Sequence, residues 1–286
     1  MIRVLLTGGT GSFGRGFVRT LMADKSQDYH VRVFSRDEHK QREMRKEFSD
    51  GRVAFFIGDV RDRERLAQVA EGADWIVHAA ALKQAPLGEI EPQEFIKTNV
   101  YGSLNVIDAA LKHDTEKTLL ISTDKAVEPI NLYGATKMCA EKLFLQADRA
   151  DAYGYLRFAC TRYGNVAGTS GSLVPLLRNL PDGEPAPVTD PQATRFWINL
   201  PEANAFVLET MKLSAERFGG RVHLPSPLRS ASVGDVVEAV RPGKPTKVIG
   251  LRPGDKLHEL LASEPRISSD QAPRMTVEEI RAEVAA

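Results

Sequence analysis

This sequence has little cysteine and no excess of either charge. The two cysteines, Cys139 and Cys160, cannot form a disulfide scaffold and lack the paired short spacing of a structural zinc site. We therefore expect reduced thiols and no metal centre. The 38 Lys and Arg residues balance 38 Asp and Glu, so the composition gives no support to nucleic acid as a partner.

Long hydrophobic runs are also missing. No apolar run approaches the roughly 20 residues of a membrane span, and the chain opens on a strand-like segment rather than a charged leader. We therefore expect a cytoplasmic protein without a membrane anchor or a targeting peptide. Its 286 residues, 42% of them hydrophobic, are enough for one large domain or two unequal ones.

What is present is an alternation of short apolar runs and amphipathic stretches over the first 160 residues or so. This alternation is typical of a doubly wound α/β fold, a Rossmann fold, whose parallel sheet is buried on both faces. The expected strands are residues 3–7, 31–35, 53–57, 75–79, 118–122 and 156–161, and the expected helices are residues 13–21, 62–69, 92–111 and 132–147.

From about residue 163 onward, frequent prolines interrupt this alternation. We expect an NADP-binding domain over residues 1–162 and a smaller, interleaved nucleotide-sugar-binding region over residues 163–286. That region should lie over the carboxyl ends of the strands, where open α/β sheets bind ligands. In the polar tail, Thr276 and Glu279 have the spacing of a capping box at a helix N-terminus.

A glycine-rich segment follows the first expected strand and opens the first expected helix. Gly8 permits the tight turn, Gly11 lets the backbone approach a pyrophosphate, and Gly14 allows close helix packing. Glycines at this spacing also occur in ordinary turns, but their place between strand and helix favours a dinucleotide loop. The predicted contacts of the loop are Gly8, Thr10, Gly11, Ser12, Phe13 and Gly14.

The end of the second expected strand lacks the acidic residue that binds the ribose 2′-hydroxyl of NAD. It reads Ser35-Arg36, with Lys40 following, and a hydroxyl with two cations suits the 2′-phosphate of NADP. A solvated charged loop is the alternative. Asp59 is placed to meet the adenine or to cap the next helix. The other predicted cofactor contacts are Val60, Ala79, Ala80, Lys83, Tyr133 and Lys137.

Tyr133 and Lys137 lie four residues apart in an expected helix, and therefore on one face. A tyrosine with the ordinary pKa near 10 is a poor base at neutral pH, but an ammonium one turn away stabilises its phenolate. The spacing alone is common on amphipathic helices. Together with the glycine loop it predicts a catalytic pair.

Motifs follow one another in order along most of the chain: TGGTGSFG (7–14), SRDE (35–38), GDVRD (58–62), HAAALK (78–83), STDKA (122–126), YGATK (133–137), TRYGNV (161–166), TRFW (194–197) and GLRPGDKLHE (250–259). Together they resemble the UDP-N-acetylglucosamine 4,6-dehydratases of the pseudaminic-acid type, which are extended short-chain dehydrogenase/reductases. The resemblance runs from about residue 2 to residue 261.

This resemblance implies a set of catalytic roles. Tyr133, aided by Thr123 and held by Lys137, would take the proton of the sugar 4-hydroxyl while C4 gives hydride to NADP⁺. Asp124 would protonate the departing 6-hydroxyl, and Lys125 would be the base at C5, with inversion there. The base role requires a depressed pKa for Lys125, which we expect from burial beside Lys137 and the nicotinamide.

The resemblance also implies a UDP-sugar substrate and assembly into a homo-oligomer. The expected substrate contacts are Lys83, Asn165, Arg195 and Arg252. Gln84 and Ser170 depart from the usual His and Arg of the family. A 4-epimerase or another C5-epimerising enzyme would share the Tyr-Lys pair without needing the Asp-Lys pair, and remains an alternative, as does a non-catalytic binding protein.

Overall fold

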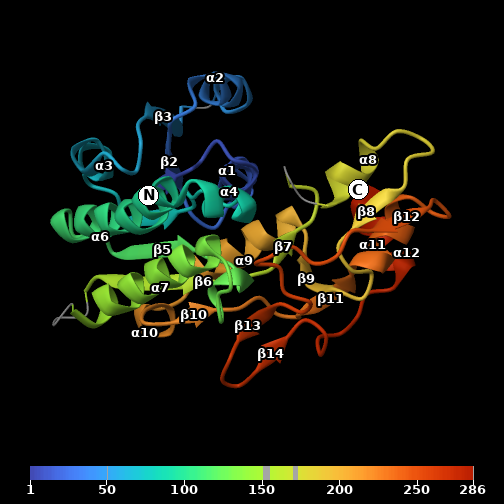
Figure 1. Cartoon of the computed structure of the whole chain (residues 1–286). Helices are drawn as coiled ribbons and strands as arrows, with labels where there is room; N and C mark the ends of the chain where they lie inside the picture. Colours follow the sequence, from blue (N-terminus) through green and yellow to red (C-terminus); the bar gives the residue numbers. More distant parts are fainter. Residues whose placement is uncertain (50, 151–154, 170–172, 286) are drawn as a thin grey trace.

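The computed structural model describes residues 1–49, 51–150, 155–169 and 173–285 (Figure 1). Its main sheet has the strand order β10-β6-β5-β4-β1-β2-β3, with every neighbouring pair parallel. The strands are β1 (Ile2–Thr7), β2 (Tyr29–Ser35), β3 (Val53–Ile57), β4 (Trp75–His78), β5 (Lys117–Ile121), β6 (Arg157–Thr161) and β10 (Val222–His223). The predicted doubly wound Rossmann fold is confirmed.

Helices cover both faces of this sheet and each face has its own apolar core. One core joins α1 (Ser12–Ala23), α2 (Glu38–Glu47) and α9 (Leu200–Lys212) to the sheet through buried side chains such as Phe17 and Met211. The other joins α3 (Arg63–Ala70), α6 (Gly102–Lys112) and α7 (Leu132–Ala150). Burial on both faces explains why the strands are apolar runs rather than alternating ones.

The single helix expected over residues 92–111 is wrong. The segment comprises α5 (Pro92–Phe95), a π-helix (Ile96–Tyr101, η1) and α6, and α4 (Ala85–Ile90) precedes it. The wider π-helical turn contains buried Asn99, which makes three side-chain hydrogen bonds outside its own helix. The helix α2 was also missed, because it is strongly polar; Asp37 caps it by accepting from Lys40 N at 2.9 Å.

The second region contains small sheets beside a third apolar core. Its strands are β7 (Asn165–Val166), β9 (Thr194–Ile198) and β11 (Arg229–Ser232), then β8 (Ala186–Val188) with β12 (Thr246–Val248), and β13 (Leu260–Ala262) with β14 (Ile267–Ser268). Its helices are α8 (Leu173–Arg178), α11 (Val233–Val240) and α12 (Val277–Ala285), while α10 (Ala215–Phe218) precedes β10. The boundary at residue 163 stays a prediction, because β10 returns to the main sheet and α9 packs on α1.

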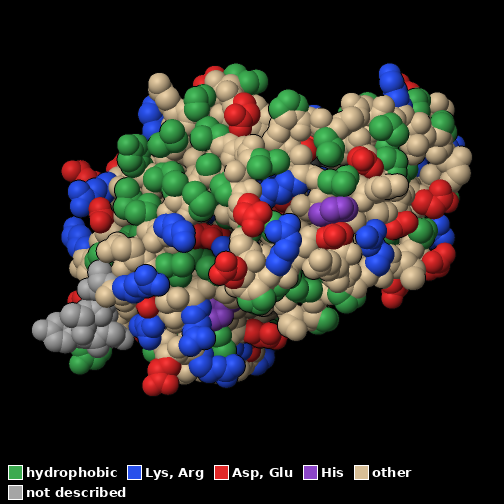
Figure 2. Space-filling view, turned by 60° about the horizontal axis from the view of Figure 1, so that its bottom comes forward, with side chains coloured by type: hydrophobic (Ala, Val, Ile, Leu, Met, Phe, Trp, Pro, Cys, Tyr) green, Lys and Arg blue, Asp and Glu red, His purple; other side chains and the backbone are tan. Residues whose placement is uncertain are grey.

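The capping box predicted in the tail is confirmed. Thr276 N donates to Glu279 Oε2 at 2.8 Å, and Glu279 N donates to Thr276 Oγ1 at 3.2 Å, at the start of α12. No helix in the described part of the chain is long and apolar enough to cross a membrane. On the face shown in Figure 2, acidic and basic side chains lie interspersed, as the balanced composition leads one to expect.

Candidate active site

The glycine loop lies between β1 and α1, and at Gly8 and Gly14 it leaves no room for a Cβ. Gly8 has φ +67°, and a Cβ there would lie 2.7 Å from the backbone N of Ala80. A Cβ on Gly14 would lie 2.5 Å from Gly9 Cα, where the helix crosses the loop. No side chain caps the N-terminus of α1. The loop thus presents the uncapped N-terminus of a helix, the positive end of its dipole, which suits a phosphate.

Several of the residues predicted to contact the cofactor make contacts within the protein, close to the loop. Ala80 N donates to Thr7 Oγ1 at 3.3 Å, and Ala79 N donates to the Thr7 carbonyl at 3.2 Å. Phe13 stacks on Phe17 with 5.6 Å between ring centroids. Val60 is buried, and its carbonyl accepts from Asn105. These contacts join β1 to the segment after β4, and the segment after β3 to α6, where the dinucleotide would lie.

The predicted 2′-phosphate residues differ in exposure. The Ser35 hydroxyl is buried and accepts from Gln41 Nε2 at 3.1 Å. The Arg36 side chain is 56% exposed, with its guanidinium 3.6 Å from Asp59 Oδ2, while Lys40 pairs with Asp37 at 3.2 Å. Arg36 and Lys40 are therefore both exposed to a ligand, whereas Ser35 is held in the protein interior.

Asp59 does not cap α3, so that alternative is wrong. The cap is Asp62, whose Oδ1 accepts from Arg65 N at 3.0 Å. Asp59 instead accepts from the backbone and guanidinium of Arg61. Burial works to raise the pKa of Asp59, but these hydrogen bonds outweigh it and lower the pKa. Asp59 is therefore a charged acceptor beside Arg36.

Asn99 was missed by the sequence analysis and holds the segment that carries Lys83. Its Oδ1 accepts from Leu82 N at 2.8 Å, and its Nδ2 donates to the Leu82 carbonyl and to Thr136 Oγ1. The signal available in the sequence was an amide side chain within the helix expected over residues 92–111. Burial lowers the pKa of Lys83, although the residue keeps much of its surface exposed.

Tyr133 and Lys137 lie at the start of α7, directly after the turn that follows β5. Lys137 Nζ donates to the Ile121 carbonyl at 2.8 Å, and burial lowers the pKa of Lys137 to about 8 although Glu141 opposes the shift. Burial raises the pKa of Tyr133, while Lys125 and a hydrogen bond from Thr123 act to lower it. In this structure the cation that acts on the phenol is Lys125, whereas Lys137 was expected to do so.

Lys125 lies between two carboxylates. Its Nζ is 3.1 Å from Asp124 Oδ1, 3.3 Å from Glu259 Oε1 and 3.2 Å from Asn165 Oδ1. Burial alone would lower the pKa of Lys125, but the two carboxylates raise it above its ordinary value. The expected depression beside Lys137 is wrong for this structure, because the nearest charges to the ammonium are negative.

Glu259 is the main site residue that the sequence analysis did not assign. It ends the GLRPGDKLHE motif, and its side chain is 4% exposed. Burial and Asp124 raise the pKa of Glu259, against Lys125, Arg195 and Lys256. Its place in the same motif as Arg252, a predicted substrate contact, was the available signal in the sequence.

The predicted substrate residues are only partly brought together. Asn165 contacts Lys125, and Arg195 Nε lies 4.0 Å from Glu259 Oε1. Arg195 also donates to the Thr194 and Leu257 carbonyls. Arg252 is instead exposed and paired with Asp255 at 2.8 Å. Ser170, the departure from the family pattern, lies outside the described residues.

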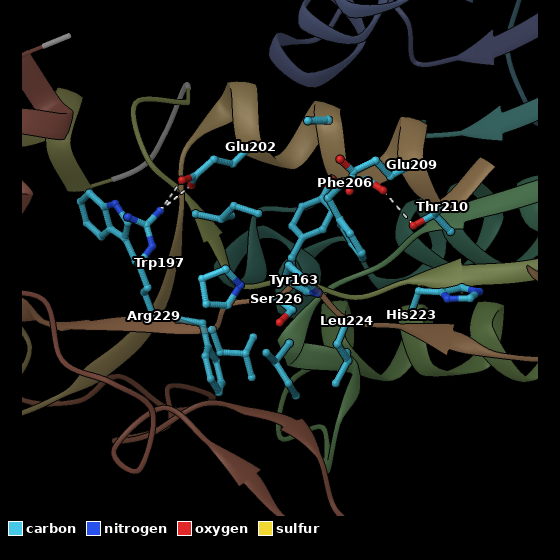
Figure 3. Close-up of a pocket in the computed structure, with 18 of the residues that line it drawn as sticks. Tyr163, Trp197, Glu202, Phe206, Glu209, Thr210, His223, Leu224, Ser226 and Arg229 are labelled. Carbon is cyan, nitrogen blue, oxygen red and sulfur yellow. Dashed lines mark hydrogen bonds and ion pairs between the residues drawn. The ribbon is translucent and has the colours of Figure 1, made fainter. Parts of the chain in front are cut away.

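A pocket of about 600 Å³ lies next to this cluster, between α9 and residues 224–229 (Figure 3). Tyr163 and Gly164 line it on the side of the cluster, since a Cβ on Gly164 would lie 3.2 Å from Asp124 Oδ2. The pocket's described lining includes none of the predicted site residues. In the described part of the chain, no His, Cys, Asp and Glu side chains group as metal ligands would.

Comparison with known proteins places the chain in a family. The model of the polysaccharide biosynthesis protein family matches residues 4–279. The chain belongs to this family of extended short-chain dehydrogenase/reductases. It is 42% identical over 262 residues to a UDP-N-acetylglucosamine 4,6-dehydratase (inverting) of Campylobacter jejuni, covering 91% of this chain and 77% of that protein.

Other relatives carry a different activity. A UDP-glucose 4-epimerase of Rickettsia akari is 39% identical over 267 residues, covering 91% of this chain and 77% of that protein. The X-ray structure of Pen from Bacillus thuringiensis has a TM-score of 0.91 at 29% identity, covering 99% of this chain and 97% of that one. Dehydratase and epimerase relatives are similarly close, so the residues of the site must separate the two activities.

Proposed function

We propose that this protein is an NADP-dependent UDP-N-acetylglucosamine 4,6-dehydratase that inverts C5. The observation that carries the proposal is the contact at 3.1 Å between the buried Asp124 and the partly buried Lys125, next to Tyr133. A 4-epimerase needs one hydroxyl deprotonated and hydride exchanged at C4. It has no use for a second acid-base pair, whereas elimination of water across C5 and C6 requires both an acid and a base.

The first step falls to Tyr133. As phenolate it would take the proton of the sugar 4-hydroxyl, with the hydroxyl of Thr123 and the charge of Lys125 favouring the ionised form. Bound nicotinamide dinucleotide would accept the C4 hydride and return it to C6. The backbone cradle at Gly8 and Gly14, the uncapped start of α1 and the exposed Arg36 fit the phosphates of NADP.

The second step falls to Asp124 and Lys125. The 4-ketone acidifies the C5 proton, which Lys125 would remove as Asp124 protonates the leaving 6-hydroxyl, so that water departs. Moving one proton from the Lys125 ammonium to Asp124 Oδ1, across 3.1 Å, converts the resting ion pair into amine and acid without net change of charge. After hydride reaches C6, a proton from solvent would reach C5 on the face opposite Lys125, and the Lys125 ammonium would pass its proton to Asp124, which restores the amine and the acid.

The UDP part of the substrate is assigned to cations of the second region and to Lys83. Arg195 is mostly buried next to Glu259, and its planar fork suits a phosphate. Arg252 would have to exchange its partner Asp255 for the ligand. Association into a homo-oligomer stays a prediction, with a mass above that of one chain expected by light scattering at micromolar concentration.

Incubation of the purified protein with UDP-N-acetylglucosamine, followed by NMR in D₂O, tests the proposal. We expect a UDP-4-keto-6-deoxy sugar of L-arabino configuration with deuterium at C5, and no lasting absorbance at 340 nm because hydride is returned. A product that is only the C4 epimer would establish the 4-epimerase instead. A dehydrated product of D-xylo configuration would retain the dehydratase and reject inversion.

A further inference from the structure

Two buried carboxylates share the ammonium of Lys125. Asp124 is 0% exposed and Glu259 4%. Within the described residues, Asp124 Oδ2 and Glu259 Oε2 are buried without a hydrogen-bond partner. Carboxylates that are buried and incompletely hydrogen-bonded depend strongly on a neighbouring cation. The Lys125 ammonium is therefore the group that balances both charges.

Glu259 is fixed in place by its backbone. Its N–H donates to Ser269 Oγ at 2.9 Å, and its carbonyl accepts from Ser269 N at 2.9 Å, where the chain enters β13. The Ser269 hydroxyl in turn contacts Thr194 Oγ1 at 2.6 Å. These contacts join the segment to β9 and fix the backbone from which the Glu259 carboxylate reaches Lys125.

The other charged or ionisable groups around the pair are few among the described residues. Tyr133 faces Lys125, and the neutral amide of Asn165 contacts its Nζ. Arg195 and Lys256 face Glu259. Both affect the pKa of Glu259 less than Asp124 and Lys125 do.

We propose that Glu259 is a positioning residue that holds one proton on the Asp124–Lys125 pair. The inference rests on the proposed function for its catalytic meaning, but the proton itself can be followed without turnover. With Glu259 charged, the pair retains its single proton into alkaline conditions. That proton is the one Asp124 needs for the leaving hydroxyl once it has passed from Lys125.

Acylation of Lys125 by an amine-reactive ester, followed by peptide mass spectrometry from neutral to alkaline pH, tests this role. The ester reacts only with the neutral amine, so the midpoint of its pH profile reports loss of the proton. In Glu259→Gln we expect the midpoint to fall by about 1–3 pH units, the shift that one adjacent charge produces. In Glu128→Gln, which removes an exposed carboxylate paired with Arg266, it should not move. An unchanged midpoint in Glu259→Gln would overturn the proposal.

Two further measurements guard against a folding defect. In the wild type itself, Lys125 should acylate with a midpoint above the ordinary lysine value near 10.4, and a midpoint at or below that value rejects the proposal without any variant. In turnover, the alkaline limb of kcat in Glu259→Gln should move to lower pH than in wild type, while Glu259→Asp, which keeps the charge, restores it. A purely structural role would lower kcat equally at all pH values.

The outcomes separate the two proposals. A shifted acylation midpoint without any dehydrated sugar product would reject the dehydratase and retain the coupling of Glu259 to Lys125. A dehydrated product with an unshifted midpoint would retain the dehydratase and reject the role of Glu259.

Discussion

The glycine loop and the acid-base cluster lie at the same edge of the sheet but are assembled in different ways. The loop is made of consecutive residues, and its shape follows from backbone conformation at Gly8 and close packing at Gly14. The cluster joins Asp124 and Lys125, which follow β5, to Asn165 in β7 and Glu259 before β13. One is a local structure and the other exists only in the folded chain.

This difference determines what each part controls. Steric demands at the loop depend on a few neighbouring atoms, so a substitution there should change cofactor affinity. Proton affinities in the cluster depend on charges from distant segments, as the raised pKa of Lys125 illustrates. Substitutions there should change chemistry and leave cofactor binding intact.

The largest effect is expected from breaking the cluster. Lys125→Ala or Asp124→Asn should lower turnover by on the order of 10²–10⁴, the usual contribution of a positioned acid or base. Cofactor and UDP binding should survive, because the loop is untouched. Steady-state kinetics and calorimetry check both statements.

Tyr133→Phe is the matched comparison for these variants. It should prevent the first oxidation, so that no enzyme-bound NADPH appears at 340 nm in a single turnover. The Lys125→Ala enzyme should still form NADPH and a 4-keto sugar that retains its 6-hydroxyl. Wild-type dehydration by Lys125→Ala would contradict the assigned elimination.

The sheet could be predicted because its signals are local. The strand Val53–Ile57 was predicted with its observed bounds, and the other predicted strands are off by two residues at most at either end. Apolar runs and the glycine loop depend on neighbouring residues. The π-helix at Ile96–Tyr101 was not predicted, because its reason is the distant contacts of Asn99 with Leu82 and Thr136.

The residues of the candidate site were found more readily than their protonation states. Asp124 and Lys125 were named from their motif, but the expected depression of the pKa of Lys125 considered only cations. Glu259, 134 residues further along the sequence, reverses that shift together with Asp124. A motif specifies which residue types are present, whereas their pKa values require the assembled charges.

The second-largest effect is expected in the pH dependence of the protein's stability, through Lys137. Its pKa is lowered from 10.5 to about 8 in the folded protein, so between these values the unfolded chain holds a proton that the folded chain has lost. Stability from this residue therefore rises as pH rises through that window and is constant below it. Compared with Lys137→Met, the wild type should gain about 3 kcal/mol across the window. Urea unfolding of both proteins measures the difference in their free energies of unfolding. A difference that stays constant or falls as pH rises would contradict the lowered pKa of Lys137.

A smaller effect is expected from Gly8→Ala, with Gly183→Ala as its control. Both glycines have positive φ, but a Cβ at Gly8 meets the Ala80 backbone whereas a Cβ at Gly183 meets nothing within 4 Å. Each variant should lose about 1–2 kcal/mol of stability from backbone strain, and Gly8→Ala should lose more because its Cβ meets backbone atoms. Only Gly8→Ala should also weaken cofactor binding, by about tenfold or more, equivalent to 1.4 kcal/mol. Equal cofactor affinities in the two variants, by calorimetry, would remove the loop from the binding site.

The smallest effect is expected at Arg36, which tests the choice of NADP over NAD. Because its guanidinium is exposed and faces Asp59, its attraction for a 2′-phosphate is screened by solvent and should contribute about 0.2–1 kcal/mol. Arg36→Ala should therefore weaken NADP binding by up to about fivefold and leave NAD binding unchanged, and the loss should shrink at high salt. Lys46→Ala removes an exposed cation that is paired with Glu43, three residues earlier in α2. It should change neither affinity. If the wild type binds NAD as tightly as NADP by calorimetry, Arg36 and its neighbours do not select the cofactor.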